Sequence, residues 1–312
     1  MNKILIVGGA GYVGGYLTDY LLEQGYDVTV YDNLTYETRF LKDVKFVFGD
    51  IRDTCKLKAI INDYDGIIWL AAVVGDGACE VDKNLTFDVN DNSVRWFTDN
   101  YSGKKVFLST CSVYGVNNDL IDEEADPNPI STYASTKLSA EQYLLQKDPS
   151  ALAYRLGTLF GVGDSFSRIR LDLVVNILSK KATCGEKLTV YGGEQWRPLL
   201  HVRDVAGAID FGLKNDICGL YNLSYKNYKI YEIAEEIQKV NPHTEIIYQD
   251  IKFEDLRNYK VKTDKMLSTG WTAKYDLSFG IKQIERIIKE NRIVNTSDPV
   301  YSNVAYLSKI WR

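Results

Sequence analysis

A glycine-rich loop between a short apolar run and a helical pattern constrains the fold of this chain more than any other feature. The run KILIV (3–7) reads as a buried strand, and GGAGYVGG (8–15) follows it directly. Gly8, Gly11 and Gly14 fit G-x-x-G-x-x-G, and an overlapping G-x-G-x-x-G begins one residue later. Glycines so placed permit a tight turn, close approach of the backbone to a pyrophosphate, and close packing of helix on strand. The stretch predicts a dinucleotide-binding turn, with the pyrophosphate at the N-terminus of the following helix.

Short β-rich runs alternate with longer helical patterns through the first half of the chain. The expected strands are 3–7, 27–31, 44–48, 65–72, 104–110 and 151–156, and the expected helices between them are about 12–24, 53–62, 85–99 and 131–147. The strand interiors are nearly continuously apolar, as in strands buried on both faces. This alternation predicts an α/β fold, a doubly wound parallel sheet covered by helices on both sides.

The alternation loosens after about Gly161. The expected elements are a helix near 168–180, a strand in 187–193, a strand entering a helix in 197–213, strands at 219–224 and 245–249, and helices at 229–240 and 278–291. These predict a smaller C-terminal α/β lobe, with a ligand crevice between the lobes. We expect a cofactor-binding domain at 1–165 and a substrate-binding lobe at 166–312, with part of 198–225 returning to the first domain.

The composition argues against several classes of protein. The net charge is -5 and the basic residues are dispersed, so we expect no nucleic-acid partner. Five scattered cysteines without a C-x-x-C pair, and only two histidines, argue against a disulfide framework and a metal site. The N-terminal apolar run is short for a signal peptide, and no stretch of about 18 apolar residues occurs. We therefore expect a cytoplasmic protein without a membrane partner.

Asp32 ends the second expected strand, 18 residues beyond Gly14. A carboxylate there accepts hydrogen bonds from a ribose 2′-hydroxyl and repels a 2′-phosphate. The structural alternative is an Asx turn at DNL (32–34). Because the acid follows a strand–glycine loop–helix pattern, it predicts NAD rather than NADP as the cofactor.

Tyr133 and Lys137 lie four residues apart in ISTYASTKLSAEQYLL (130–145), on an expected helix. Residues i and i+4 are neighbours on a helix surface, so the phenol and the ammonium can share one small site. The pair could be an exposed helix feature worth a few tenths of a kcal/mol at most. Alternatively, it could be a catalytic phenol whose pKa is lowered by a nearby cation. This stretch alone leaves both readings open.

Together, these motifs resemble the extended short-chain dehydrogenase/reductase family. The resemblance rests on the spaced glycines, Asp32, LAA at 70–72, STCSVYG at 109–115 and Tyr-x-x-x-Lys at 133–137, and it extends to HVRDVAGAI at 201–209. Within the family the chain is most similar to enzymes that modify the sugar of nucleotide-sugars. The resemblance implies a Rossmann-like fold, bound NAD and a nucleotide-diphosphate sugar as substrate.

The resemblance also implies roles for single residues. Tyr133 would be the base that removes a proton from a sugar hydroxyl while hydride leaves the same carbon for NAD. Lys137 and the positive nicotinamide would favour the phenolate, and Lys137 would hold the nicotinamide ribose. Thr110 would hydrogen-bond the reacting oxygen. Without the surrounding motif, a threonine here could equally well be a β-branched residue that ends a strand. The implied cofactor-binding residues are Gly8, Gly11, Tyr12, Val13, Gly14, Asp32, Asn33, Asp50, Ile51, Leu70, Ala71, Ala72, Tyr133 and Lys137.

The implied substrate site draws on both halves of the chain. Arg197 and Arg257 match family positions, and two convergent guanidinium groups suit a pyrophosphate. Without this match, each arginine would be interpreted as a member of a surface ion pair. Asn176 lies near the start of an expected helix, where the family directs an amide towards the sugar diphosphate. The implied substrate-binding residues are Val74, Thr110, Ser112, Asn176, Arg197 and Arg257, and no metal ligand is implied.

The two residues directly after the expected catalytic threonine limit the types of reaction that the site could perform. Nucleotide-sugar 4,6-dehydratases carry Asp and then Glu there, whereas this chain has Cys111 and Ser112, neither a suitable general acid at neutral pH. Dehydration is therefore disfavoured, and Asp32 disfavours an NADPH reductase. Oxidation at C4 remains. The leading hypothesis is a 4-epimerase, which returns the hydride to the other face of the sugar.

Two alternatives stay open. The segments AAVVGDGAC (71–79) and RIRLDLVVN (168–176) resemble a branch that includes C4-dehydrogenases of GDP-heptose, which release the ketone. A non-catalytic NAD-binding module is the third hypothesis. In this family the helices near 85–99 and 131–147 often pair across a two-fold axis, so we expect a homodimer.

Overall fold

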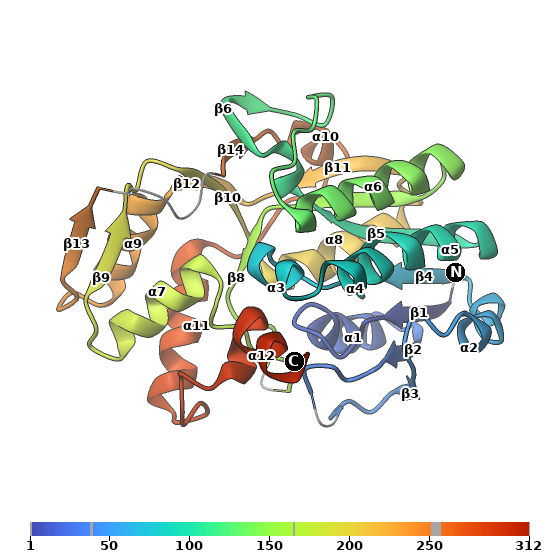
Figure 1. Cartoon of the computed structure of the whole chain (residues 1–312), viewed down its shortest axis with the longest axis horizontal. Coiled ribbons are helices and arrows are strands. Elements are labelled where there is room, and N and C mark those ends of the chain that lie inside the picture. The colour runs from blue at the N-terminus through green and yellow to red at the C-terminus, as the bar shows by residue number, and fades with distance from the viewer. Residues whose placement is uncertain (1, 38–39, 165, 251–256, 312) are drawn as a thin grey trace.

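Seven parallel strands form the main sheet of the computed structural model, which describes residues 2–37, 40–164, 166–250 and 257–311 (Figure 1). Their order is β11-β7-β5-β4-β1-β2-β3, and every neighbouring pair is parallel. The strands are β1 (Lys3–Val7), β2 (Asp27–Asp32), β3 (Lys45–Phe48), β4 (Gly66–Trp69), β5 (Lys104–Thr110), β7 (Leu152–Leu156) and β11 (Gly219–Leu223). The chain runs outward from β1 to β3 and then returns to β4 on the other side. The predicted doubly wound α/β fold is confirmed.

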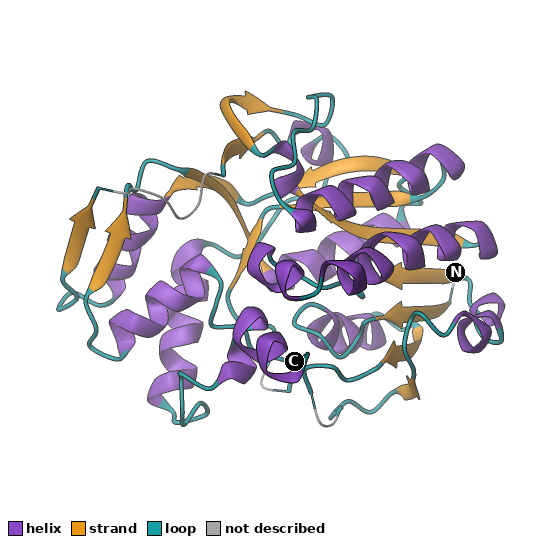
Figure 2. Ribbon diagram, viewed as in Figure 1, coloured by secondary structure: helices purple, strands orange, loops and turns teal. Residues whose placement is uncertain are grey.

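Helices cover both faces of this sheet (Figure 2). Ile4 and Ile6 of β1 pack in a core with α1 (Gly14–Glu23) and α8 (Val202–Lys214). Leu5 and Val7 face the opposite way and pack with α5 (Ser93–Asn100) and α6 (Thr132–Lys147). Successive strand residues point to opposite faces, so a continuously apolar strand fills two cores. Fully burying each such side chain contributes about 1.5–3 kcal/mol.

The C-terminal lobe has its own core. In it, α7 (Val174–Thr183), α9 (Ile230–Val240) and α11 (Leu277–Lys289) pack against the parallel pair β9 (Leu188–Tyr191) and β13 (Ile246–Gln249). A three-stranded sheet joins β8 (Thr158–Phe160), β10 (Trp196–His201) and β12 (Lys226–Lys229), and β6 (Val116–Ile121) pairs with β14 (Asn258–Val261). The chain passes between the two halves several times, because β11 and α8 lie with the main sheet. The division at 165/166 stays a prediction.

Several predicted boundaries were wrong. The helix expected near 168–180 begins only at Val174, and the segment before it is not helical. The strand expected at 65–72 ends at Trp69, and the helix expected at 53–62 is divided into α2 (Thr54–Lys58) and a 3₁₀ turn (Ile61–Asp63). Asp53 caps α2 by accepting a hydrogen bond from the backbone N–H of Lys56 at 3.0 Å.

Some elements were not predicted. They are β6, β8, β12, β14, α3 (Asp76–Val81), α10 (Asp264–Leu267), a 3₁₀ turn (Pro299–Tyr301) and α12 (Asn303–Ile310). The helix expected at 85–99 is present as α4 (Lys83–Phe87), which continues through a π-helical turn (Asp88–Asn92) into α5. The unpredicted strands have three to six residues. Among the described residues, none of the helices is long and apolar enough to cross a membrane.

Candidate active site

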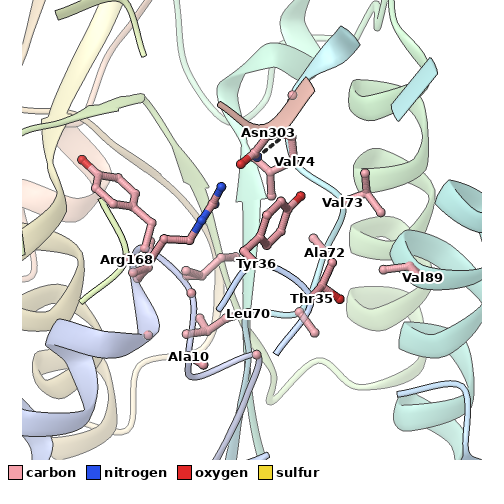
Figure 3. A pocket seen from close by; sticks show the side chains of 18 of the residues that line it. Ala10, Thr35, Tyr36, Leu70, Ala72, Val73, Val74, Val89, Arg168 and Asn303 are labelled. Carbon is pink, nitrogen blue, oxygen red and sulfur yellow. Dashed lines mark hydrogen bonds between the residues drawn. The ribbon is translucent and has the colours of Figure 1, made fainter. Parts of the chain in front are cut away.

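A cavity of about 360 Å³ opens where the carboxyl ends of the main strands meet the C-terminal lobe (Figure 3). The residues that follow β1, β2, β4, β5 and β7 all contribute to its lining. Ligands of open α/β sheets bind at this edge, where the strand order reverses. The lining includes every residue predicted to bind cofactor or substrate except Asn176 and Arg197.

The glycine loop approaches its neighbours so closely that side chains are excluded. Gly8 has a φ of +84°, and a Cβ there would lie 2.4 Å from the backbone nitrogen of Ala71. A Cβ on Gly14 would lie 2.5 Å from the Cα of Gly9. No side chain caps the N-terminus of α1, so its first turn can present backbone N–H groups to an anion. The loop therefore has the shape of a pyrophosphate cradle.

Asp32 lines the cavity and also stabilises the loops around it. Its Oδ2 accepts the backbone N–H of Ala10 at 3.0 Å, and its Oδ1 accepts that of Leu34 at 2.7 Å. The second bond is the Asx turn weighed as the alternative, so the carboxylate has a structural role as well. Burial raises the pKa of Asp32, and hydrogen bonds from the backbone of Leu34, Ala10 and Asn33 oppose that rise. Each carboxylate oxygen retains a lone pair for a ribose hydroxyl.

The structure brings Thr110, Tyr133 and Lys137 together. Thr110 ends β5, and its side chain lies within hydrogen-bonding range of the Tyr133 phenol on α6. The Lys137 ammonium lies 3.9 Å from the ring centre of Phe107 and is only 3 % exposed. Ser131 caps α6 by accepting the Ala134 N–H at 3.2 Å. The helix start is thus fixed, which aims the phenol and the ammonium into the same cavity.

In the protein without cofactor the pKa of the Tyr133 phenol is raised rather than lowered, and the expectation that Lys137 and the positive nicotinamide together favour the phenolate stays a prediction. Burial raises the pKa of Tyr133 above its usual 10, the nearby Cys79 raises it further, and Thr110 opposes the rise. Burial also lowers the pKa of Lys137 from 10.5 to about 7. Desolvation disfavours the charged form of both groups and is the largest cause of each shift. A phenolate at this position therefore requires further positive charge.

Arg257 and Ser112, both predicted to bind the substrate, line the cavity. The Arg257 guanidinium pairs with the Asp76 carboxylate at 3.0 Å, and its side chain is 27 % exposed. The Ser112 hydroxyl lies 3.2 Å from the hydroxyl of Tyr259. These groups place one cation and one hydroxyl where a polar ligand can reach them.

The two predicted arginines do not converge on the cavity. Arg197 lies behind it, where Nη1 donates to the carbonyl oxygens of Trp196 at 2.8 Å and Arg257 at 2.6 Å. Arg197 therefore supports the backbone that carries Arg257. The reason is local: β10 directs the Arg197 side chain towards Tyr259, with the guanidinium 5.8 Å from that ring centre.

Asn176 also lies outside the cavity lining. Its amide accepts the Gly161 N–H at 2.8 Å and donates to the Arg170 carbonyl at 2.8 Å, and the residue is fully buried. These bonds tie the loop after β8 to the segment before α7. The predicted amide directed at the sugar diphosphate is not found in this geometry, because both ends of the amide bind backbone.

The lining residues that sequence reasoning missed include Tyr36, Arg168, Arg170, Asn303 and Trp311. The two arginines in RIRLD could have indicated an anion-binding site. They were instead assigned to the predicted helix over 168–180, so their position beside the cavity was not recognised. The last two residues come from the C-terminal segment, where α12 packs beside α3. Nothing local in that segment indicated that it reaches the cavity. Among the described residues, no group of His, Cys, Asp and Glu side chains could hold a metal ion.

Comparison with known proteins agrees with this geometry. The model of the NAD dependent epimerase/dehydratase family matches residues 4–224. A putative UDP-glucose 4-epimerase of Methanocaldococcus jannaschii is 28% identical over 303 residues, which cover 92% of this chain and 99% of that protein. The UDP-glucose 4-epimerase of Lactobacillus helveticus is 26% identical, with 86% of this chain and 96% of that protein covered.

Two solved structures are also similar. Pal from Bacillus thuringiensis has a TM-score of 0.81 and 26% identity, covering 93% of this chain and 99% of that one. The UDP-glucose 4-epimerase of Thermus thermophilus, solved in complex with NAD, has a TM-score of 0.79 and 25% identity, covering 92% and 99%. The predicted kinship with extended short-chain dehydrogenases and the predicted NAD dependence are confirmed. On its fold, its cavity and a family match over most of its length, this chain belongs to the NAD-dependent epimerase/dehydratase family.

Proposed function

We propose that this protein is a nucleotide-sugar 4-epimerase that uses bound NAD. The observation that carries the proposal is the arrangement of Thr110, Tyr133 and Lys137 in the cavity that also holds the glycine loop and Arg257. The named relatives include UDP-glucose 4-epimerases, so a UDP-sugar is the first substrate to test.

The lining fits NAD along the length of the cavity. The glycine loop and the N-terminus of α1 suit the pyrophosphate, and Asp32 suits the hydroxyls of the adenosine ribose. Asp50 and Ile51 are assigned to the adenine, and Lys137 to the nicotinamide ribose. Bound there, NAD supplies the acceptor and then the donor of the hydride at C4.

The protein's own residues handle the proton. Tyr133 accepts the proton of the C4 hydroxyl as the hydride leaves, and it returns the proton when the hydride comes back. Since burial raises the pKa of this phenol, the positive nicotinamide and a protonated Lys137 must favour the phenolate, at about 1.4 kcal/mol per pKa unit. Thr110 hydrogen-bonds the same oxygen and orients it towards the phenol.

The residues after Thr110 argue against a dehydratase. The Cys111 thiol is fully buried and donates to the Arg155 carbonyl at 3.2 Å, so it points away from the cavity. Burial raises the pKa of this thiol far above its usual range. Ser112 is engaged with Tyr259. Neither side chain can supply the acid that elimination of water needs.

A 4-dehydrogenase is the second candidate. Arg168, Arg170, Val73 and Val74 come from the two segments that resemble the GDP-heptose dehydrogenase branch, and all four line the cavity. The two functions share the oxidation step and differ in whether the ketone leaves.

Proton NMR on a panel of UDP-, GDP-, CDP- and dTDP-sugars, incubated without added NAD, tests the proposal. Catalytic inversion at C4 of one sugar is expected. At most one equivalent of ketone per protein, with the cofactor left reduced, would instead favour the dehydrogenase.

Asp32→Ser should weaken the preference for NAD over NADP. The variant removes the charge that repels a 2′-phosphate and the oxygens that bind the ribose, so we expect the ratio of the two Kd values to shift at least tenfold, or about 1.4 kcal/mol. Cofactor titrations monitored by NADH and NADPH fluorescence measure it. Asp27→Ser, at the other end of β2, is the matched control. An unchanged ratio in the Asp32 variant would remove this residue from the cofactor site.

A further inference from the structure

Arg168 is a buried cation without a direct carboxylate partner among the described residues, and the Asp172 and Glu37 carboxylates attract it only from beyond ion-pair distance. The residue is 6 % exposed, and within the described part of the chain its guanidinium forms no ion pair. Its Nη2 donates to the Val300 carbonyl at 3.3 Å, and its Nε has no hydrogen-bond partner among the described residues. Two other buried arginines are paired with carboxylates, Arg155 with Glu141 at 2.6 Å and Arg170 with Asp172 at 2.9 Å. An unpaired buried charge costs several kcal/mol, so Arg168 is suited to a ligand anion.

The position of Arg168 is on the dinucleotide side of the cavity. A Cβ on Gly15 would lie 2.6 Å from the Ser167 hydroxyl, so the preceding residue rests directly on the first turn of α1. The guanidinium lies 3.8 Å from the ring centre of Tyr36, in the loop that follows Asp32. Figure 3 shows the side chain reaching towards Tyr36, above the loop that carries Ala10. Arg168 thus lines the cavity beside the first turn of α1 and the loop that follows Asp32.

The C-terminal segment holds this arrangement in place. Val300 accepts the Nη2 hydrogen bond, and the backbone N–H of Asn303 donates to Asp172 at 2.8 Å. The Asn303 amide donates to the Val74 carbonyl at 2.7 Å, and its Oδ1 is buried without a partner among the described residues. The C-terminal segment therefore lines the cavity in the same region and leaves there a second buried polar atom without a partner among the described residues.

We propose that Arg168 binds the pyrophosphate of NAD opposite the glycine loop, an assignment that rests on the proposed function only in taking NAD as the bound cofactor. A guanidinium forks two phosphate oxygens, while the N-terminus of α1 binds the diphosphate from the other side. Burial and the like charge of Arg170 lower the pKa of Arg168 to about 10, so the group stays protonated at neutral pH. A cofactor gripped from both walls stays bound through many turnovers, as an epimerase requires.

Binding measurements on cofactor-free protein test this assignment without turnover. We expect Arg168→Gln to raise the Kd for NADH by at least about tenfold. The Kd for ADP-ribose, which carries the pyrophosphate without nicotinamide, should rise by a similar factor. Arg168→Lys keeps the charge but loses the fork, so we expect a smaller loss. The affinity for UDP, the probe for a substrate diphosphate, should not change. Arg286→Gln, an exposed arginine paired with Glu290 on α11, is the matched control.

Two results would overturn the assignment. If Arg168→Gln lowered the affinity for UDP and left the affinities for NADH and ADP-ribose unchanged, Arg168 would bind the substrate's diphosphate instead. Unchanged affinity for all three probes would leave it without either role. If the glutamine variant did not fold, as judged by its melting temperature, Arg168→Lys would carry the test, with unchanged cofactor affinity as the contrary result. These binding measurements do not depend on turnover, so they would still test the role of Arg168 if the protein epimerised no sugar.

Discussion

Tyr133→Phe should lower kcat by about 10²- to 10⁴-fold, the range over which a positioned general base contributes. The substitution removes the only atom of this side chain that can hold the proton of the sugar hydroxyl, and it retains the ring that packs against the cavity wall. NAD affinity should therefore change little. Turnover of the sugar identified by NMR, together with an NADH fluorescence titration, measures both quantities.

The control for this variant lies on the same helix. Tyr143 is on α6, and its hydroxyl donates to Asp99 at 2.8 Å, away from the cavity. Tyr143→Phe should retain full activity. Full activity in Tyr133→Phe as well would show that another group accepts the proton, and it would remove Tyr133 from the catalytic step.

Lys137→Met should abolish activity and yet stabilise the cofactor-free protein by a few kcal/mol at pH 7. Burial lowers the pKa of Lys137 from 10.5 to about 7, so the folded state binds fewer protons than the unfolded state between these values. The cost of burying the ammonium is fully present below pH 7, and it disappears as the pH rises towards 10.5. The stabilisation should therefore shrink along the same interval.

Urea denaturation at pH 7 and pH 9.5 measures this gain. Lys147→Met, in the last turn of α6, is the matched control and should change the free energy of unfolding by less than about 0.5 kcal/mol at both pH values. A Lys137→Met protein less stable than the wild type at pH 7 would mean that the ammonium is better compensated than its surroundings indicate.

Features encoded in short stretches were predictable from the sequence. The glycine loop, Asp32 and the Tyr133–Lys137 pair each depend on a strand end or a helix turn, so spacing alone placed them on the cavity wall. Arg197 was different, because its side-chain direction is decided by the carbonyl of Arg257, 60 residues away.

Other features depend on packing between distant segments. Arg168 was assigned to a helix because RIRLDLVVN has a helical pattern, whereas the contact of its neighbour Ser167 with α1 sets its position. Asn303 reaches Val74 across more than two hundred residues of sequence. The pKa shift of Tyr133 also follows from burial, which no local pattern reports.

The central claim is that the hydride removed from C4 returns to the same sugar molecule. The most direct test is a crossover experiment with the sugar found by NMR, deuterated at C4 and mixed with a distinguishable unlabelled nucleotide-sugar, without added NAD. The account predicts that the inverted product keeps its deuterium at C4 and that none passes to the unlabelled sugar. Release of a ketone that has lost its deuterium, at no more than one equivalent per protein, would contradict it.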